Sequence, residues 1–161
     1  MTDEREIAAA TTRDPRPALF AAAAVLAYLI VRSLVGLIGW TPGSGVDVGM
    51  MSYFGREAVL SSLPLAVGVF LLLWLVPVRP RDRLLLIVAK GLLAALAGVT
   101  LAELVGFAFA GIQAGLGVLR DLPHLTPIAL PAQIVSGTVA AAPVVILAVL
   151  LVHLVGRGER S

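Results

Sequence analysis

The stretch "LLLWLVPVRPRDRLLLIVAKGLLAAL", residues 71–96, decides the fold. It holds two apolar runs joined by a short segment, "PVRPRDR", which is rich in proline and arginine. The apolar runs continue outward, to about Ala58 on one side and past Gly111 on the other. Each is therefore longer than the roughly 18 residues that mark a membrane-spanning helix. So short a connection predicts an antiparallel hairpin of transmembrane helices.

Composition extends this prediction to the whole chain. Of the 161 residues, 59% are hydrophobic and 14% are charged, whereas about a quarter are charged in a soluble domain. The mean hydropathy is +0.99. We predict an all-α integral membrane protein, an up-down bundle of four transmembrane helices. The predicted spans are residues 18–40, 58–78, 84–112 and 132–155, preceded by a disordered cytoplasmic segment (1–17) and followed by a cytoplasmic tail (156–161).

The distribution of basic residues predicts the orientation, because cytoplasmic flanks of transmembrane helices carry an excess of Lys and Arg. Eight arginines flank the spans on one side of the membrane and two on the other. The first group is Arg5, Arg13, Arg16, Arg79, Arg81, Arg83, Arg157 and Arg160, and the second is Arg56 and Arg120. Both termini are thus predicted to be cytoplasmic. Arg79, Arg81 and Arg83 are expected to contact anionic lipid headgroups, with Asp82 capping the third helix.

The third apolar run, from Leu84 to Leu119, leaves two interpretations open. A helix of that length would measure about 54 Å, too long for one upright crossing. Either the helix tilts strongly, or it ends between Gly111 and Gly117; we favour the second. Lys90, about two turns into this run, is expected to reach back toward the arginine segment.

Two charged residues interrupt the outer parts of the spans. Arg32 lies about 21 Å from the predicted start of the first span and Glu103 about 28 Å from that of the third. Since both helices run the same way, the two charges differ in depth by only about 7 Å. One hypothesis is an ion pair between Arg32 and Glu103, and the alternative is that Arg32 reaches the outer headgroups. Gly36 and Gly39 share a helix face with Arg32 and would allow a second helix to approach.

Small residues recur at every fourth position of the third span. Such a small-xxx-small pattern is typical of surfaces on which membrane helices pack closely. We call these residues the small-residue ridge: Ala94, Gly98, Ala102, Gly106, Ala110 and Ala114. Pro64 and Pro143 are expected to kink the second and fourth spans.

The sequence contains no recognisable catalytic or cofactor-binding set. There is no cysteine, and His124 and His153 fall on opposite sides of the membrane, so they cannot ligate one haem. No spacing of His, Asp and Glu within a span suits a metal site. Asp47 and Asp121 are interpreted as loop residues. We predict no cofactor, no metal and no nucleic-acid partner; an enzyme is the least favoured class.

The function that the sequence favours is a packing, assembly or accessory subunit acting through helix–helix contacts. Its partners would be the lipid bilayer and either a second copy of the chain or another membrane protein. The alternative is a small carrier or channel subunit that uses Arg32 and Glu103 as intramembrane polar groups; a carrier predicts a water-accessible cavity reaching Glu103. The excess of arginine over lysine suggests GC-rich codons and so a bacterial inner membrane.

Overall fold

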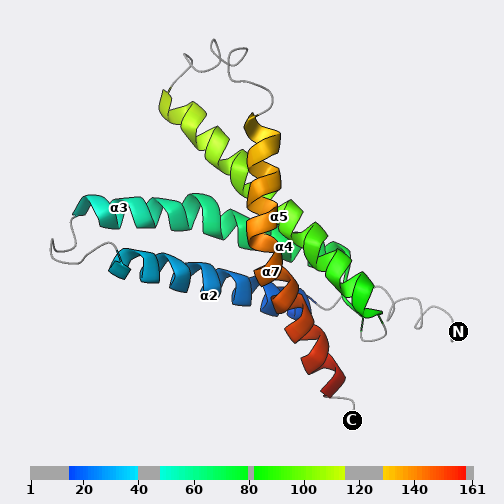
Figure 1. Ribbon diagram of the computed structural model, residues 1–161. Helices are drawn as coiled ribbons and strands as arrows, with labels where there is room; N and C mark the ends of the chain where they lie inside the picture. Colours follow the sequence, from blue (N-terminus) through cyan, green and yellow to red (C-terminus); the bar gives the residue numbers. More distant parts are fainter. Residues whose placement is uncertain (1–14, 40–47, 80–81, 115–128, 159–161) are drawn as a thin grey trace, which may run out of the picture.

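The computed structural model describes residues 15–39, 48–79, 82–114 and 129–158, and all regular structure in these ranges is helical (Figure 1). The elements are α2 (Arg16–Gly39), α3 (Val48–Glu57), the π-helix η1 (Ala58–Ser62), α4 (Leu63–Leu75), α5 (Leu84–Ala114) and α7 (Ala129–Gly158). Because α3, η1 and α4 follow one another without a break, they form one continuous helix.

Four helices among the described residues are long and apolar enough to span a membrane. They cover Arg16–Ile38, Ser52–Leu75, Leu84–Gln113 and Leu130–Val155. The predicted number and positions of the apolar helices are therefore confirmed. The second begins before residue 58, its predicted start, since Arg56 and Glu57 are in α3. Helical backbone satisfies its own hydrogen bonds, so a helix can continue beyond its apolar part.

Proline affects the backbone of the second spanning helix at the predicted position. Pro64 stands in the first turn of α4, directly after η1. The N–H of Leu63 donates to the carbonyl of Ala58, five residues earlier. This wider turn accommodates the proline ring, which would otherwise meet the carbonyl four residues before it. The disturbance predicted from Pro64 thus takes the form of a π-helical turn.

The four spanning helices pack in the ring order α2, α4, α5, α7, so that α2 and α5 are diagonal to each other. They meet at one end of the bundle and diverge toward the other, where α2 and α3 run one way and α5 and α7 another (Figure 1). We call the first the basic end, because Arg16, Arg79 and Arg83 lie there, and the second the open end. The described core lies toward the basic end: Ala18, Ala21, Val25, Val69, Leu73, Ile87, Ala94, Ala95, Ala142, Val145, Ala148 and Val149.

Glycine allows α4 and α5 to approach closely. A Cβ added at Gly68 would lie 2.6 Å from the Cα of Gly98, and one added at Gly98 would lie 2.7 Å from the carbonyl oxygen of Leu65. Two helix backbones therefore touch at this crossing, and even an alanine has no room in either position.

Candidate functional site

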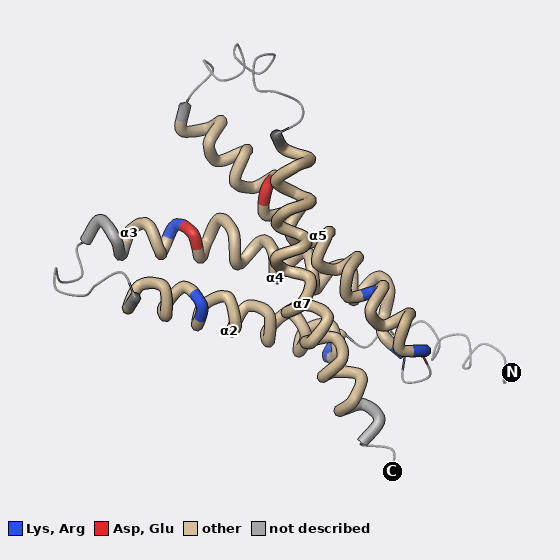
Figure 2. The backbone as a smooth tube through the Cα atoms, viewed as in Figure 1, with Lys and Arg blue, Asp and Glu red and all other residues tan. Residues whose placement is uncertain are grey.

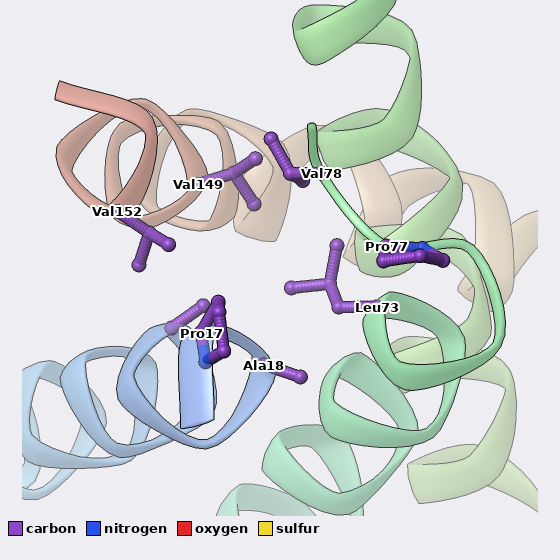
Figure 3. A pocket seen from close by; sticks show the side chains of 8 residues that line it. Pro17, Ala18, Leu73, Pro77, Val78, Val149 and Val152 are labelled. Atoms are coloured by element: carbon purple, nitrogen blue, oxygen red, sulfur yellow. The ribbon is translucent and has the colours of Figure 1, made fainter. Parts of the chain in front are cut away.

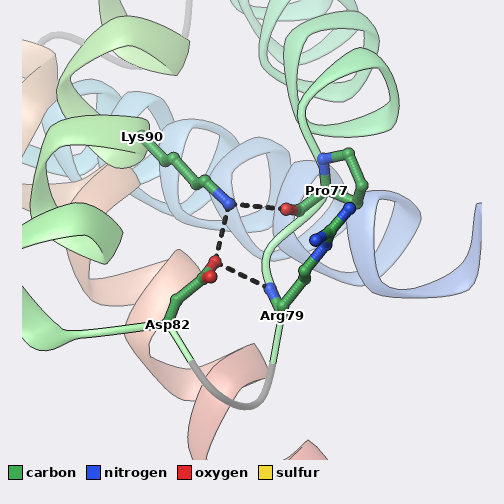
Figure 4. A network of polar contacts seen from close by, with 4 residues as sticks. All are labelled: Pro77, Arg79, Asp82 and Lys90. Atoms are coloured by element: carbon green, nitrogen blue, oxygen red, sulfur yellow. Dashed lines mark hydrogen bonds and ion pairs between the residues drawn. The ribbon is translucent and has the colours of Figure 1, made fainter.

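A polar network fastens the loop between α4 and α5 at the basic end (Figure 4). The Lys90 ammonium donates to the carbonyl of Pro77 (2.7 Å) and to Oδ2 of Asp82 (2.6 Å). The same Asp82 oxygen accepts a hydrogen bond from the backbone N–H of Arg79 (2.9 Å). Lys90 thus points back toward the arginine segment, as predicted. Asp82 bonds to Arg79 and Lys90 rather than to the first N–H groups of α5.

The contacts of Asp82 with Lys90 and Arg79 favour the ionised form of its carboxyl group. Burial by itself would raise the pKa of the Asp82 carboxyl, but the hydrogen bond from Lys90 lowers it. The hydrogen bond from Arg79 and the positive charges of both residues act in the same direction, and the pKa is lower than its ordinary value of 3.8. These contacts join the loop to α5 and so stabilise the hairpin, and they engage the Lys90 ammonium and one Asp82 oxygen within the chain.

The basic end of the bundle is closed by apolar side chains. A small cavity remains there, of only about 20 Å³, hardly more than one water molecule occupies. Figure 3 shows its lining side chains from α2, α4, α7 and the loop after α4 pointing toward one another. They are Pro17, Ala18, Ala21, Leu73, Pro77, Val78, Val149 and Val152. With no charged side chain in its wall, this cavity is a packing gap.

A second cavity, of about 200 Å³, lies where the helices begin to diverge. We call it the central cavity. All four spanning helices contribute to its wall. The lining residues are Val25, Tyr28, Leu29 and Arg32 of α2, Ser61 of η1, Leu65 of α4, Val99, Ala102 and Glu103 of α5, and Gly137, Ala140, Ala141, Val144 and Val145 of α7.

The central cavity has a buried floor and an exposed mouth. Val25, Val99 and Val145 are 4% exposed or less, and they separate the cavity from the basic end. Tyr28 and Arg32, farther along α2, are exposed. The cavity therefore opens away from the basic end.

Arg32 and Glu103 are the charged residues of this wall. Charged positions are few along the diverging parts of the helices (Figure 2). Neither side chain makes a hydrogen bond or an ion pair of 4.0 Å or less with any described residue, and the ion pair found among those residues joins Lys90 to Asp82. The structure thus brings the two predicted charges to one cavity without joining them, and their direct pairing stays a prediction.

Beyond the mouth, Arg56 connects α3 to the far part of α5. Its guanidinium carbon lies 5.0 Å from the centre of the Phe109 ring, and Nη2 donates to Oε1 of Gln113 at 3.4 Å. This contact could not be predicted from the sequence, because Arg56 and Gln113 are 57 residues apart. The contact thus links α3 to α5 at the open end.

The small-residue ridge is divided between two environments. Ala94 and Gly98 are buried within the chain, and Ala102 lines the central cavity. A Cβ added at Gly106 would have no neighbour within 4 Å, and Ala110 is exposed. The side chain of Ala114 lies outside the described part. On α2, a Cβ at Gly36 likewise meets nothing within 4 Å, so no helix of the described part packs against it.

The remaining predicted residues lie outside the site or outside the described ranges. Arg79 and Arg83 are exposed at the basic end. His153 is buried in α7, and its Nδ1 has no hydrogen-bond partner among the residues that the structure describes. Within the described ranges, no group of three His, Cys, Asp or Glu residues could hold a metal ion. Outside those ranges lie Asp47, Arg81, Arg120, Asp121 and His124.

Comparison of the chain with protein families, with curated proteins and with solved structures finds no match. Within the described part of the chain, the central cavity and its two charges are therefore the best candidate for a functional site.

Proposed function

We propose that the chain is a multi-pass protein of a bacterial inner membrane with both termini in the cytoplasm. Four long apolar helices support the membrane assignment, and the excess of arginines at the basic end supports the orientation. Arg79 and Arg83, which are exposed at the basic end, then face the headgroups of the inner leaflet. In this orientation the central cavity opens toward the outer side.

We further propose that it is a small carrier that binds a polar solute in the central cavity. The observation that carries this proposal is that Arg32 and Glu103 line one cavity and have no partner in the described structure. A charge in a membrane helix costs about 2.5–3.5 kcal/mol on insertion scales. Charges retained at that cost mark functional positions, among them the pathways of substrates, ions and protons. A cavity between helices, with an apolar wall and few polar groups, is the usual form of a ligand site.

The asymmetry of the bundle supports a carrier more than a channel. The core toward the basic end is closed, while the other ends of the helices diverge (Figure 1). That arrangement corresponds to the outward-open state of a carrier. The π-helical turn at Ala58–Ser62, next to Pro64, is a place where α3 can bend relative to α4.

The carrier proposal is tested by labelling single cysteines with a membrane-impermeant maleimide. Because the chain has no cysteine, each variant carries a single thiol. Ala102→Cys lies in the cavity wall, Leu104→Cys is a lipid-facing control on the same helix, and Ala95→Cys is a buried control. Right-side-out and inside-out vesicles separate the two faces of the membrane.

A carrier predicts rapid labelling of Ala102→Cys from the outer face, and slower labelling from the inner face as the protein changes state. Both controls stay unlabelled. Labelling from the outer face alone would indicate a binding protein that does not translocate its ligand. No labelling from either face would refute the proposal.

A packing or accessory subunit is the second candidate. One observation favours it: the outer part of the small-residue ridge, Gly106 and Ala110, has no neighbouring helix within the described chain. This candidate predicts that Ala102→Cys is labelled in the isolated protein and is shielded when the chain is in its native complex. Labelling in native membranes therefore separates the two functions.

A further inference from the structure

We propose that the ligand of the central cavity is a small zwitterion with an apolar body, such as an aliphatic amino acid or a betaine. The inference rests on the carrier function proposed above and specifies its substrate class. It follows from the charges, the remaining polar groups and the size of the cavity.

Charge balance is the first argument. Among the described residues that line the cavity, one is positive, Arg32, and one is negative, Glu103, so the charges of this wall balance. A singly charged ligand would pair with one of them, leave the other unpaired and give the filled cavity a net charge. Such a charge is less favourable than a paired one wherever the ligand replaces water against the apolar wall. A zwitterion pairs both wall charges and keeps the filled cavity neutral.

The two charged side chains also match the two groups of a zwitterion chemically. The planar guanidinium of Arg32 can donate two parallel hydrogen bonds to a carboxylate. The carboxylate of Glu103 can accept from an ammonium group or attract a quaternary one. Tyr28 and Ser61 place hydroxyl groups on the same wall, where each can donate or accept one further hydrogen bond.

The rest of the wall sets the size and character of the ligand body. Leu29, Leu65 and Val144 are apolar, and they can cover an aliphatic or aromatic group of the ligand. The volume of about 200 Å³ is smaller than the roughly 300–1,000 Å³ of sites for drug-sized molecules. A single amino acid is therefore closer to the expected size than a peptide or a nucleotide.

The Ala102→Cys variant, reconstituted as full chain in liposomes, tests this inference through protection from maleimide. The probes are leucine and two analogues that each lack one charge, isocaproate without the ammonium and isoamylamine without the carboxylate. Proline, phenylalanine and glycine betaine extend the zwitterion set. At least one zwitterion is expected to slow labelling, with an affinity about 10- to 100-fold higher than that of its singly charged analogues, because each analogue lacks one charged hydrogen-bonding pair.

Neutralising one wall charge gives the sharper test, because it should reverse the preference. Glu103→Gln leaves Arg32 unbalanced and is expected to favour isocaproate over leucine. Arg32→Gln leaves Glu103 unbalanced and is expected to favour isoamylamine. Arg83→Gln removes a charge at the basic end and should keep the preference for leucine. Thermal stabilisation by each probe, which follows from binding to the folded state alone, gives a second readout free of the cysteine.

The outcomes separate this inference from the function on which it rests. If Ala102→Cys is labelled but no zwitterion protects it, or if a singly charged analogue protects it equally well, the substrate class is wrong and the carrier proposal remains. If Ala102→Cys is not labelled at all, the carrier proposal itself fails. Unchanged ligand preference in both Gln variants would also overturn the assignment of the two charges.

Discussion

Replacing Gly98 by alanine should destabilise the bundle, although alanine is the better helix former. The added Cβ would lie 2.7 Å from the carbonyl oxygen of Leu65, and ordinary contact begins at 3.4 Å. A backbone carbonyl cannot rotate away, so α4 must move back from α5. A gap of about 0.5–1 Å already removes a quarter to a half of the dispersion energy of the facing atoms.

The magnitude follows from two opposing terms. Overpacking costs about 1–3 kcal/mol, and a clash with backbone belongs at the upper end of that range. The higher helix propensity of alanine returns about 1 kcal/mol. We therefore expect Gly98→Ala to lower the free energy of unfolding by about 2 kcal/mol. Gly106→Ala, in the same helix but with no neighbour within 4 Å of its Cβ, should raise it by up to about 1 kcal/mol.

Reversible unfolding in mixed lipid–detergent micelles, with SDS as the denaturant, measures both variants against the parent. Each variant is a control for the other, because both substitutions add one methyl group to the same helix, α5. Equal stability of Gly98→Ala and Gly106→Ala would refute the close approach of α4 and α5.

Three further predictions concern the polar contacts. Lys90→Met removes two hydrogen bonds and should lower the free energy of unfolding by about 2–4 kcal/mol in the same assay. Because the pKa of Asp82 is lowered in the folded state, its contribution to stability is present at neutral pH and is lost as the pH falls below its ordinary value of 3.8. The parent should lose stability there more steeply than Asp82→Asn, and identical acid profiles would contradict the lowered pKa. Arg56→Gln, which breaks an exposed contact with Phe109, should cost no more than about 1 kcal/mol.

Much of the fold could be predicted from hydropathy alone, because four long apolar runs have few other ways to bury their backbone polar groups. The ends of the helices were harder to predict. Arg56 and Glu57 directly precede the apolar run that starts at Ala58, yet both lie in the helix, at the end of α3. Pro64 predicted a disturbed helix, but only the structure shows a π-helical turn.

The site could be predicted in part. The depths of Arg32 and Glu103 follow from the residue count along each helix, and so does the direction in which Lys90 points. The rotation of each helix about its own axis cannot be predicted from the residue count, because it depends on how the helix packs against its neighbours. For example, a Cβ on Gly137 of α7 would lie 2.9 Å from Cγ1 of Val99 on α5. Such contacts set which side chains reach the central cavity.

The most direct test of the central claim, that Arg32 and Glu103 are unpaired and free to bind a ligand, is the stability of the protein after each charge is removed. Arg32→Met and Glu103→Gln are compared with the parent in the SDS assay without added solute. If the charges are unpaired, both variants should be at least as stable as the parent, since each loses an uncompensated charge. If the two side chains form a buried ion pair instead, each single variant should lose about 3–5 kcal/mol, and the cavity would have no free charges to offer.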